Sequence, residues 1–158
     1  MSTSRLYQLH WDLDTFFPGG SRSPQLEAFL TALQADLDRL DEATARFDPA
    51  GGPEGWVALL EQIQDVGARL GEAGSFAACL AAQDTDDEQA RLLVTRTGEL
   101  GARYAALWTR LDRHLLAVPA TAWQELLSHP ALQPIAFPLD ERRRRAAERM
   151  APEMEELA

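Results

Sequence analysis

The chain has 158 residues, a length that favours one domain with a substantial core, and 46% of its residues are hydrophobic, as in folded proteins. Its formal net charge is −10, and its sequence pI is about 4.7. This balance argues against nucleic acid or an anionic membrane surface as a general partner, because both require clustered positive charge.

Residues 1–22 are predicted to form an irregular lead segment. The stretch from Leu6 to Leu13 alternates loosely between apolar and polar residues and could be extended, and a Pro-Gly turn follows it. The aromatic residues Trp11, Phe16 and Phe17 are too apolar for a free tail. We expect them to be buried across the helices, or to be covered by another part of a larger protein.

The first long helix is predicted to begin at Ser23-Pro24, because serine is a favoured N-cap and proline is tolerated at the first helical position. It should run to about Phe47, before a break rich in proline and glycine. Its buried stripe has the spacing of an amphipathic helix and consists of Leu26, Phe29, Leu30, Leu33, Leu37 and Leu40.

The second helix is predicted to start near Pro53 and to end before Gln83-Asp84. Three glycines, Gly67, Gly71 and Gly74, each cost about 1 kcal/mol relative to alanine in a helix interior. They permit close approach of another helix, or mark a kink near Gly74, or leave a weak helix that packing rescues. The sequence leaves these alternatives open.

A third long helix is predicted from Thr85 to Val118, about 50 Å at 1.5 Å per residue. Thr85 and Glu88 have the spacing of a capping box at its start. Its buried stripe, which requires partner helices along its whole length, consists of Leu93, Leu100, Tyr104, Leu107, Leu111 and Leu115.

Shorter elements are predicted after Pro119. A capping box at Thr121 begins a short helix through Leu127, and three prolines within residues 130–138 then forbid a regular helix. The apolar residues between these prolines, Leu132, Ile135 and Phe137, are nevertheless expected to be buried. A further helix covers residues 140–150, and residues 151–158 have the pattern of another helix start. A chain that stops one turn into a helix is expected to be part of a longer protein.

Together these patterns predict an all-α fold: one domain over residues 1–158, built as an antiparallel bundle of long helices. The irregular lead segment covers residues 1–22, the helical bundle with its shorter C-terminal helices covers 23–150, and the start of a truncated helix covers 151–158.

No residue of the chain is predicted to be catalytic, to bind a cofactor or to ligate a metal. The histidines, His10, His114 and His129, lack paired metal-ligand spacing, and His114 near a helix end is explained by the helix dipole. Cys79, the one cysteine, lies in an apolar helical stretch and is expected to be buried filler.

Two charged runs have alternative explanations. The acidic residues 84–88 could suggest a divalent cation, but they lack the spacing and the glycine of a calcium loop, so helix capping explains them. The run Arg142–Arg145 could clamp a carboxylate or a phosphate. Because four successive residues point around a helix, we expect instead a solvated face that pairs with Glu141 and Glu148.

The N-terminus has no basic segment followed by an apolar run, and no stretch of about 18 apolar residues occurs. A lone cysteine excludes an internal disulfide and favours a reducing compartment. A cytoplasmic location is therefore expected.

The order of several short patterns resembles the N-terminal region of oligoendopeptidase F-type (thimet oligopeptidase-like) zinc metallopeptidases. The similarity includes an acidic break between two long helices, an apolar segment before an Arg-rich helix, and an acidic stretch that opens the next helix. The residues concerned are Trp11-Asp12-Leu13, Phe16-Phe17-Pro18-Gly19, Ser23-Pro24, Asp84-Thr85-Asp86-Asp87, Leu132 to Glu148 and Pro152 to Ala158.

The resemblance implies a non-catalytic N-terminal domain of a cytoplasmic enzyme that hydrolyses oligopeptides, forming a wall or cover of the substrate channel. A separate C-terminal catalytic domain would supply His-Glu-x-x-His and the zinc, which lowers the pKa of bound water. This chain lacks that motif and is expected to be inactive alone. The expected partners are that domain and, for the whole enzyme, short peptides, with self-association of this chain as a further expectation. The alternative is a free-standing helical interaction or scaffold module.

Overall fold

The computed structural model describes residues 12–149, and within this range the fold is entirely helical. The α-helices are α1 (Pro24–Ala45), α2 (Pro53–Gln83), α3 (Glu88–Ala117), α4 (Ala120–Ser128) and α5 (Ala136–Arg149). Short 3-10 helices are η1 (Leu13–Thr15), η2 (Gly20–Arg22) and η3 (Gln133–Ile135). The predicted all-α class is confirmed.

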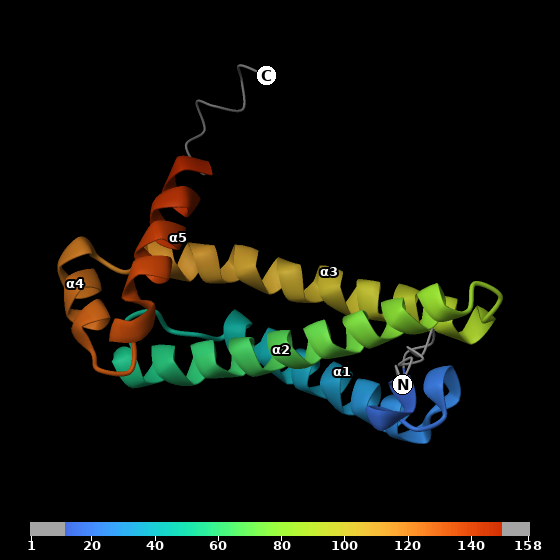
Figure 1. The fold of residues 1–158 in the computed structure, drawn as a ribbon. Helices are drawn as coiled ribbons and strands as arrows, with labels where there is room; N and C mark the ends of the chain where they lie inside the picture. The colour runs from blue at the N-terminus through green and yellow to red at the C-terminus, as the bar shows by residue number, and fades with distance from the viewer. Residues whose placement is uncertain (1–11, 150–158) are drawn as a thin grey trace, which may run out of the picture.

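The three long helices lie side by side and alternate in direction, and α2 packs against both α1 and α3 (Figure 1). The short helix α4 lies across one end of this bundle. From there the chain turns back into α5, which packs on α3 and projects away from the long axis (Figure 1). Helix α5 is therefore only partly covered by the bundle.

One continuous core runs along the three long helices. The predicted stripe of α3 is confirmed: all of its leucines are buried, and Tyr104 packs partly buried against them. The stripe of α1 is likewise buried except for Phe29, which is partly exposed. Burial of these side chains is the main stabilising contribution, at about 25 cal/mol per Å² of apolar surface.

Ion pairs between α1 and α3 follow the same heptad-like spacing as the core. Arg96, Arg103 and Arg110 on α3 contact Glu27, Asp38 and Asp41 on α1, the first two pairs at 2.7 and 2.6 Å. Each pair is substantially exposed and contributes at most about 1 kcal/mol. Their value lies in fixing which turn of α3 faces which turn of α1.

The start of α1 is confirmed, whereas the predicted start of α3 is wrong. The Ser23 hydroxyl accepts a hydrogen bond from the Leu26 N–H at 3.4 Å, as an N-cap should. Helix α3 begins at Glu88, and its N-cap is Asp87, whose carboxylate accepts from the Ala90 N–H at 3.1 Å. Thr85 lies in the preceding turn, because Asp84 accepts from the Asp86 N–H and holds that turn outside the helix.

Two predicted boundaries at the C-terminal end are also wrong. Helix α4 begins one residue earlier than predicted, with Pro119 as N-cap and no capping side chain, so Thr121 forms no capping box. Helix α5 begins at Ala136 and contains Pro138 in its first turn. A proline there costs little, because the first N–H groups of a helix have no intrahelical partner.

The glycine-bearing helix α2 is continuous through Gln83. Gly67 faces Tyr104 of α3 so closely that an added Cβ would lie 2.3 Å from the phenol oxygen, whereas nothing lies within 4 Å of such an atom at Gly71 or Gly74. Of the alternatives left open by the sequence, close helix approach therefore holds at Gly67.

The aromatic pair of the lead segment divides between core and solvent. Phe17 is buried and makes edge-to-face contacts with Phe29 and Phe76, at centroid distances of 5.5 and 5.0 Å. Phe16 is 67% exposed, so its predicted burial against the helices is wrong: the turn at residues 16–20 directs only one of the two neighbours inward. The expectations for residues 6–11 and 151–158 lie outside the described residues.

None of the described helices combines the length and the apolar character needed to cross a bilayer.

Candidate functional site

Helix α5 is attached to α3 by a buried carboxylate shared between two arginines. Asp112 of α3 is only 7% exposed. Its Oδ2 accepts a hydrogen bond from Arg149 at 2.9 Å, and its Oδ1 lies 2.6 Å from Arg142 Nε as an ion pair without hydrogen-bond alignment. Two arginines on one carboxylate leave this cluster with a net positive charge.

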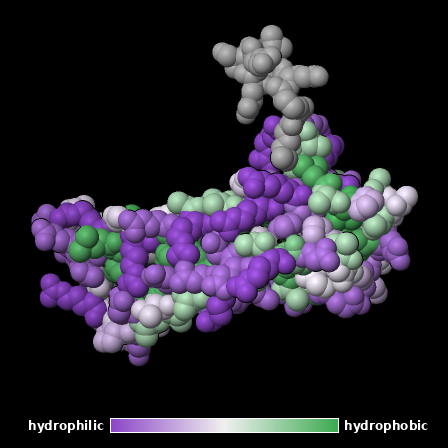
Figure 2. All heavy atoms as spheres, turned by 180° about the vertical axis from the view of Figure 1, so that it is seen from behind, coloured by the Kyte–Doolittle hydropathy of each residue, from purple (hydrophilic) through white to green (hydrophobic). Residues whose placement is uncertain are grey.

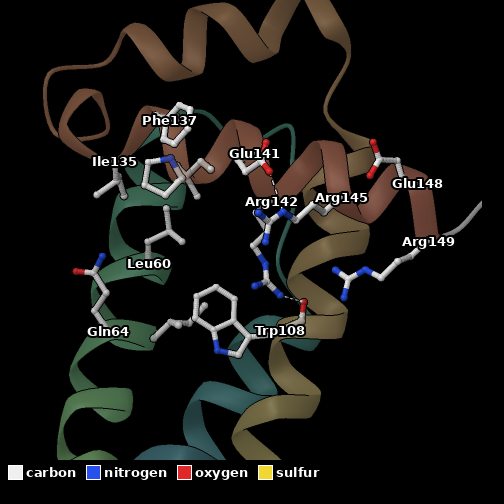
Figure 3. Close-up of a pocket in the computed structure, with 13 residues that line it drawn as sticks. Leu60, Gln64, Trp108, Ile135, Phe137, Glu141, Arg142, Arg145, Glu148 and Arg149 are labelled. Carbon is white, nitrogen blue, oxygen red and sulfur yellow. Dashed lines mark hydrogen bonds and ion pairs between the residues drawn. The ribbon is translucent and has the colours of Figure 1, made fainter.

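Arg142 is held on three sides. Its guanidinium lies 4.1 Å from the centroid of the Trp108 ring, a cation–π contact, and it donates to the Trp108 carbonyl at 3.1 Å. Figure 3 shows the side chain extending from α5 toward Trp108. Together with Asp112, these contacts fix the guanidinium in one orientation.

A neighbouring face of α5 is attached to α4 in a similar way. Arg143 lies over the Trp123 ring at 4.6 Å and donates to the Val118 carbonyl. The Trp123 indole N–H donates to Asp140 at 2.8 Å. The two adjacent arginines Arg142 and Arg143 therefore each make a cation–π contact, with Trp108 and Trp123 respectively.

The predicted solvated arginine face is confirmed only for its second half. Arg144 and Arg145 contact Glu141, and Arg144 also contacts Glu148. Hydrogen bonds from Arg144 and then Arg145 lower the pKa of Glu141 to about 2 from its usual 4.5. Arg142 and Arg143 instead lie against the bundle, because the 100° step of the helix turns them toward α3 and α4.

A groove lies between α5 and the bundle. It has a volume of about 870 Å³. Its apolar surface is supplied by Leu60 and Ile63 of α2, Trp108 of α3, Ile135 of η3 and the first turn of α5, and its far edge is charged (Figure 3). Hydrophilic side chains cover much of the long body, and hydrophobic ones gather near the base of α5 (Figure 2).

Phe137 is the most exposed large apolar side chain of the groove, at 80%. By contrast, Leu132 is buried and Ile135 is partly buried. The expectation that the apolar residues between the prolines are all buried is therefore wrong for Phe137. Sequence reasoning did not find the groove; the one available signal was this apolar stretch among prolines.

The remaining singled-out residues have local roles. His114 Nε2 donates to the Thr44 carbonyl of α1 at 2.8 Å, and its ring packs edge-on against Phe47. His129 Nδ1 accepts from the Ala131 N–H at 3.3 Å in the turn after α4. Cys79 is partly exposed, which corrects its expected burial, because it borders the buried face of α2 formed by Phe76 and Leu80.

Between residues 12 and 149, no three His, Cys, Asp or Glu side chains gather in a way that could hold a metal ion. Asp84 and Asp87 of the acidic run serve as turn and helix caps. The described side chains therefore do not fit a zinc site.

The family model described as Oligopeptidase F, for the N-terminal region of M3 peptidases, matches residues 114–158. The resemblance to oligopeptidase F is confirmed over this range. The matched stretch includes the end of α3 and all of α4, η3 and α5, so it contains one complete wall of the groove. No curated protein and no solved structure gives a significant match to the chain.

Proposed function

We propose that this chain is the non-catalytic N-terminal region of a zinc-dependent oligopeptidase and forms part of the wall of its substrate channel. The observation that carries the proposal is the match of the oligopeptidase F model to residues 114–158. The zinc, its ligands and the general base would come from a separate catalytic domain, and the whole enzyme would cleave short peptides in the cytoplasm.

The structure supports a steric role for the chain. The three long helices share one continuous core, and α5 is fixed to α3 through Asp112 and Trp108 and to α4 through Trp123. A wall of this kind can restrict access by size without touching the reacting atoms. Short unfolded peptides would pass such a wall, whereas folded proteins would not.

The first experiment is to read the natural coding sequence beyond Ala158. The proposal expects a His-Glu-x-x-His motif there, and a stop codon directly after Ala158 would instead favour a free-standing helical scaffold module. The sequence of the 158-residue chain lacks His-Glu-x-x-His, so this chain is expected to show no peptide turnover with or without Zn²⁺. Zinc-dependent turnover by the chain alone would contradict the assignment.

The second experiment tests the steric role in the complete enzyme. An internally quenched peptide is assayed free in solution and as a loop within a folded carrier domain. The proposal expects cleavage of the free peptide only, and expects the carrier to be cleaved after it is unfolded in a urea concentration that the enzyme tolerates. Equal cleavage of both forms would show that the helical wall does not select by size.

A further inference from the structure

The groove beside α5 combines an apolar surface with a positively charged edge on an otherwise acidic chain. Its volume of about 870 Å³ falls within the range of about 300–1,000 Å³ that is usual for ligand sites. Its apolar surface comes from α2, α3, η3 and α5, so residues far apart in the sequence converge on it (Figure 3).

The apolar half of the groove has an uncovered aromatic ring. Phe137 is 80% exposed, and it lies near Ile135 at the start of α5 (Figure 3). The other large apolar side chains that are exposed among residues 12–149, Phe16, Leu92 and Val94, do not line this groove. An apolar side chain of a ligand would remove the Phe137 ring and the groove surface from water together.

The polar half of the groove carries an excess positive charge. Among residues 12–149, seven charged side chains line it or contact its lining residues: Arg142, Arg144, Arg145, Arg149, Asp112, Glu141 and Glu148. Four of these are arginines and three are carboxylates, which leaves one positive charge, whereas the whole chain carries −10. The edge therefore favours a ligand carboxylate over a ligand cation.

The positive edge has a fixed part and an accessible part. Arg142 is fixed on Trp108 and Asp112, so it lies at the groove with little rotamer freedom left to lose on binding. Arg145 and Arg149 each keep 67% of the side chain exposed at the same edge. A ligand carboxylate can reach these two guanidinium groups from solvent.

We propose that this groove binds a short peptide through one large apolar side chain followed, a few residues later, by a carboxylate. The apolar side chain packs on Phe137 and the groove surface, and the carboxylate lies at Arg145 and Arg149. The choice of a peptide as occupant rests on the proposed function. The requirement for an apolar group and a carboxylate rests on the groove itself.

The test uses isothermal titration calorimetry with the 158-residue chain and four tetrapeptides. The reference probe is N-acetylated Leu-Phe-Ala-Glu amide, and the others replace Glu with Gln, replace Glu with Lys, or combine Gln with a free C-terminal carboxylate. The Gln amide is expected to bind about threefold more weakly than the Glu amide, and the Lys amide more weakly still. The fourth peptide distinguishes a side-chain carboxylate from a C-terminal carboxylate. If it binds as tightly as the Glu amide, the contact is assigned to the C-terminal carboxylate of the peptide.

Variants locate the contacts. Phe137→Asp is expected to abolish binding, and Leu92→Asp, at an apolar position outside the groove that is 62% exposed, is the matched control. Arg145→Gln and Arg149→Gln are expected to weaken the Glu peptide and to leave the Gln amide unchanged. Arg39→Gln, an exposed arginine on α1, should leave both unchanged. Circular dichroism of each variant confirms folding.

Three outcomes would overturn the inference: no binding by the folded chain, equal affinity for the Glu and Lys peptides, or a dimer in sedimentation that Phe137→Asp abolishes. The last would show that the groove takes a second copy of the chain. A coding sequence without His-Glu-x-x-His, together with peptide binding, refutes the proposed function and leaves the groove assignment intact. A coding sequence with His-Glu-x-x-His, together with a folded chain that does not bind the peptides, refutes the groove assignment and leaves the proposed function intact.

Discussion

Gly67→Ala is expected to destabilise the protein, against the general preference of helices for alanine. Gly67 lies in the interior of α2, where alanine would by itself be about 1 kcal/mol more favourable. The added Cβ, however, would lie 2.3 Å from the Tyr104 oxygen and 2.8 Å from the ring carbon that carries it. Since a contact below 3 Å is untenable, the ring must move.

The magnitude follows from two costs. Moving Tyr104 breaks its hydrogen bond to the Ile63 carbonyl, which is 2.8 Å long and is worth about 0.5–1.5 kcal/mol. Overpacking at the α2–α3 contact adds about 1–3 kcal/mol. After subtraction of the propensity gain of about 1 kcal/mol, the free energy of unfolding should fall by about 0.5–3.5 kcal/mol, which corresponds to about 1–14 °C in Tm for a chain of this size.

The assay is urea and thermal unfolding followed by circular dichroism. Gly71→Ala and Gly74→Ala are the matched controls, because they lie on the same helix with open space around the added atom, and each should stabilise by up to about 1 kcal/mol. In a Tyr104→Leu background, Gly67→Ala should change sign and become stabilising. If Gly67→Ala stabilises the unmodified chain as much as Gly71→Ala does, the packing argument is refuted.

Three further predictions concern the helix cap, the shared carboxylate and pH. Because Asp87 caps α3, Asp87→Ala should lower the free energy of unfolding by about 1 kcal/mol, and Thr85→Ala should lower it by less than about 0.5 kcal/mol. Equal losses in urea titrations would indicate that Thr85 also caps the helix. Asp112→Asn should lower the free energy of unfolding by about 1–3 kcal/mol and should reduce the change in Trp fluorescence that accompanies docking of α5. The control Asp38→Asn, at an exposed ion pair, should lower it by less than about 0.5 kcal/mol. Similar losses for the two variants would mean that Asp112 does not hold α5. The folded-state pKa of Glu141 is lowered to about 2, so its contribution to stability is complete above its usual pKa of 4.5 and is lost as pH falls toward 2. The stability difference between the unmodified chain and Glu141→Gln should therefore shrink over that pH interval, and a difference that stays constant would show that the arginine contacts do not persist in solution.

Local patterns predicted the helices well, because the apolar spacing of one buried face is enough to identify a long amphipathic helix. The leucines of α3 and the Ser23-Pro24 start of α1 are examples, since each depends on residues within one or two turns. The capping of α3 shows the limit of such patterns. Thr85 and Asp87 both suit an N-cap, and the turn that Asp84 stabilises decides between them.

The candidate site depended on contacts that no local pattern contains. The four arginines of the run Arg142–Arg145 have two different roles. The first two contact side chains outside α5, namely Trp108, Asp112 and Trp123. The last two form ion pairs with a glutamate of α5 itself. In the same way Phe137 was expected to be buried, yet it is 80% exposed in the first turn of α5.

The sequence by itself determined the helical class, the buried stripes and the resemblance that the oligopeptidase F match confirms over residues 114–158. These properties follow from periodicity and order along the chain, which are local. Only the tertiary structure decided which glycine is a contact, which arginines face the bundle and where a groove opens. Those outcomes depend on the positions of α2, α3 and α5 relative to one another, which arise from packing over long sequence separations.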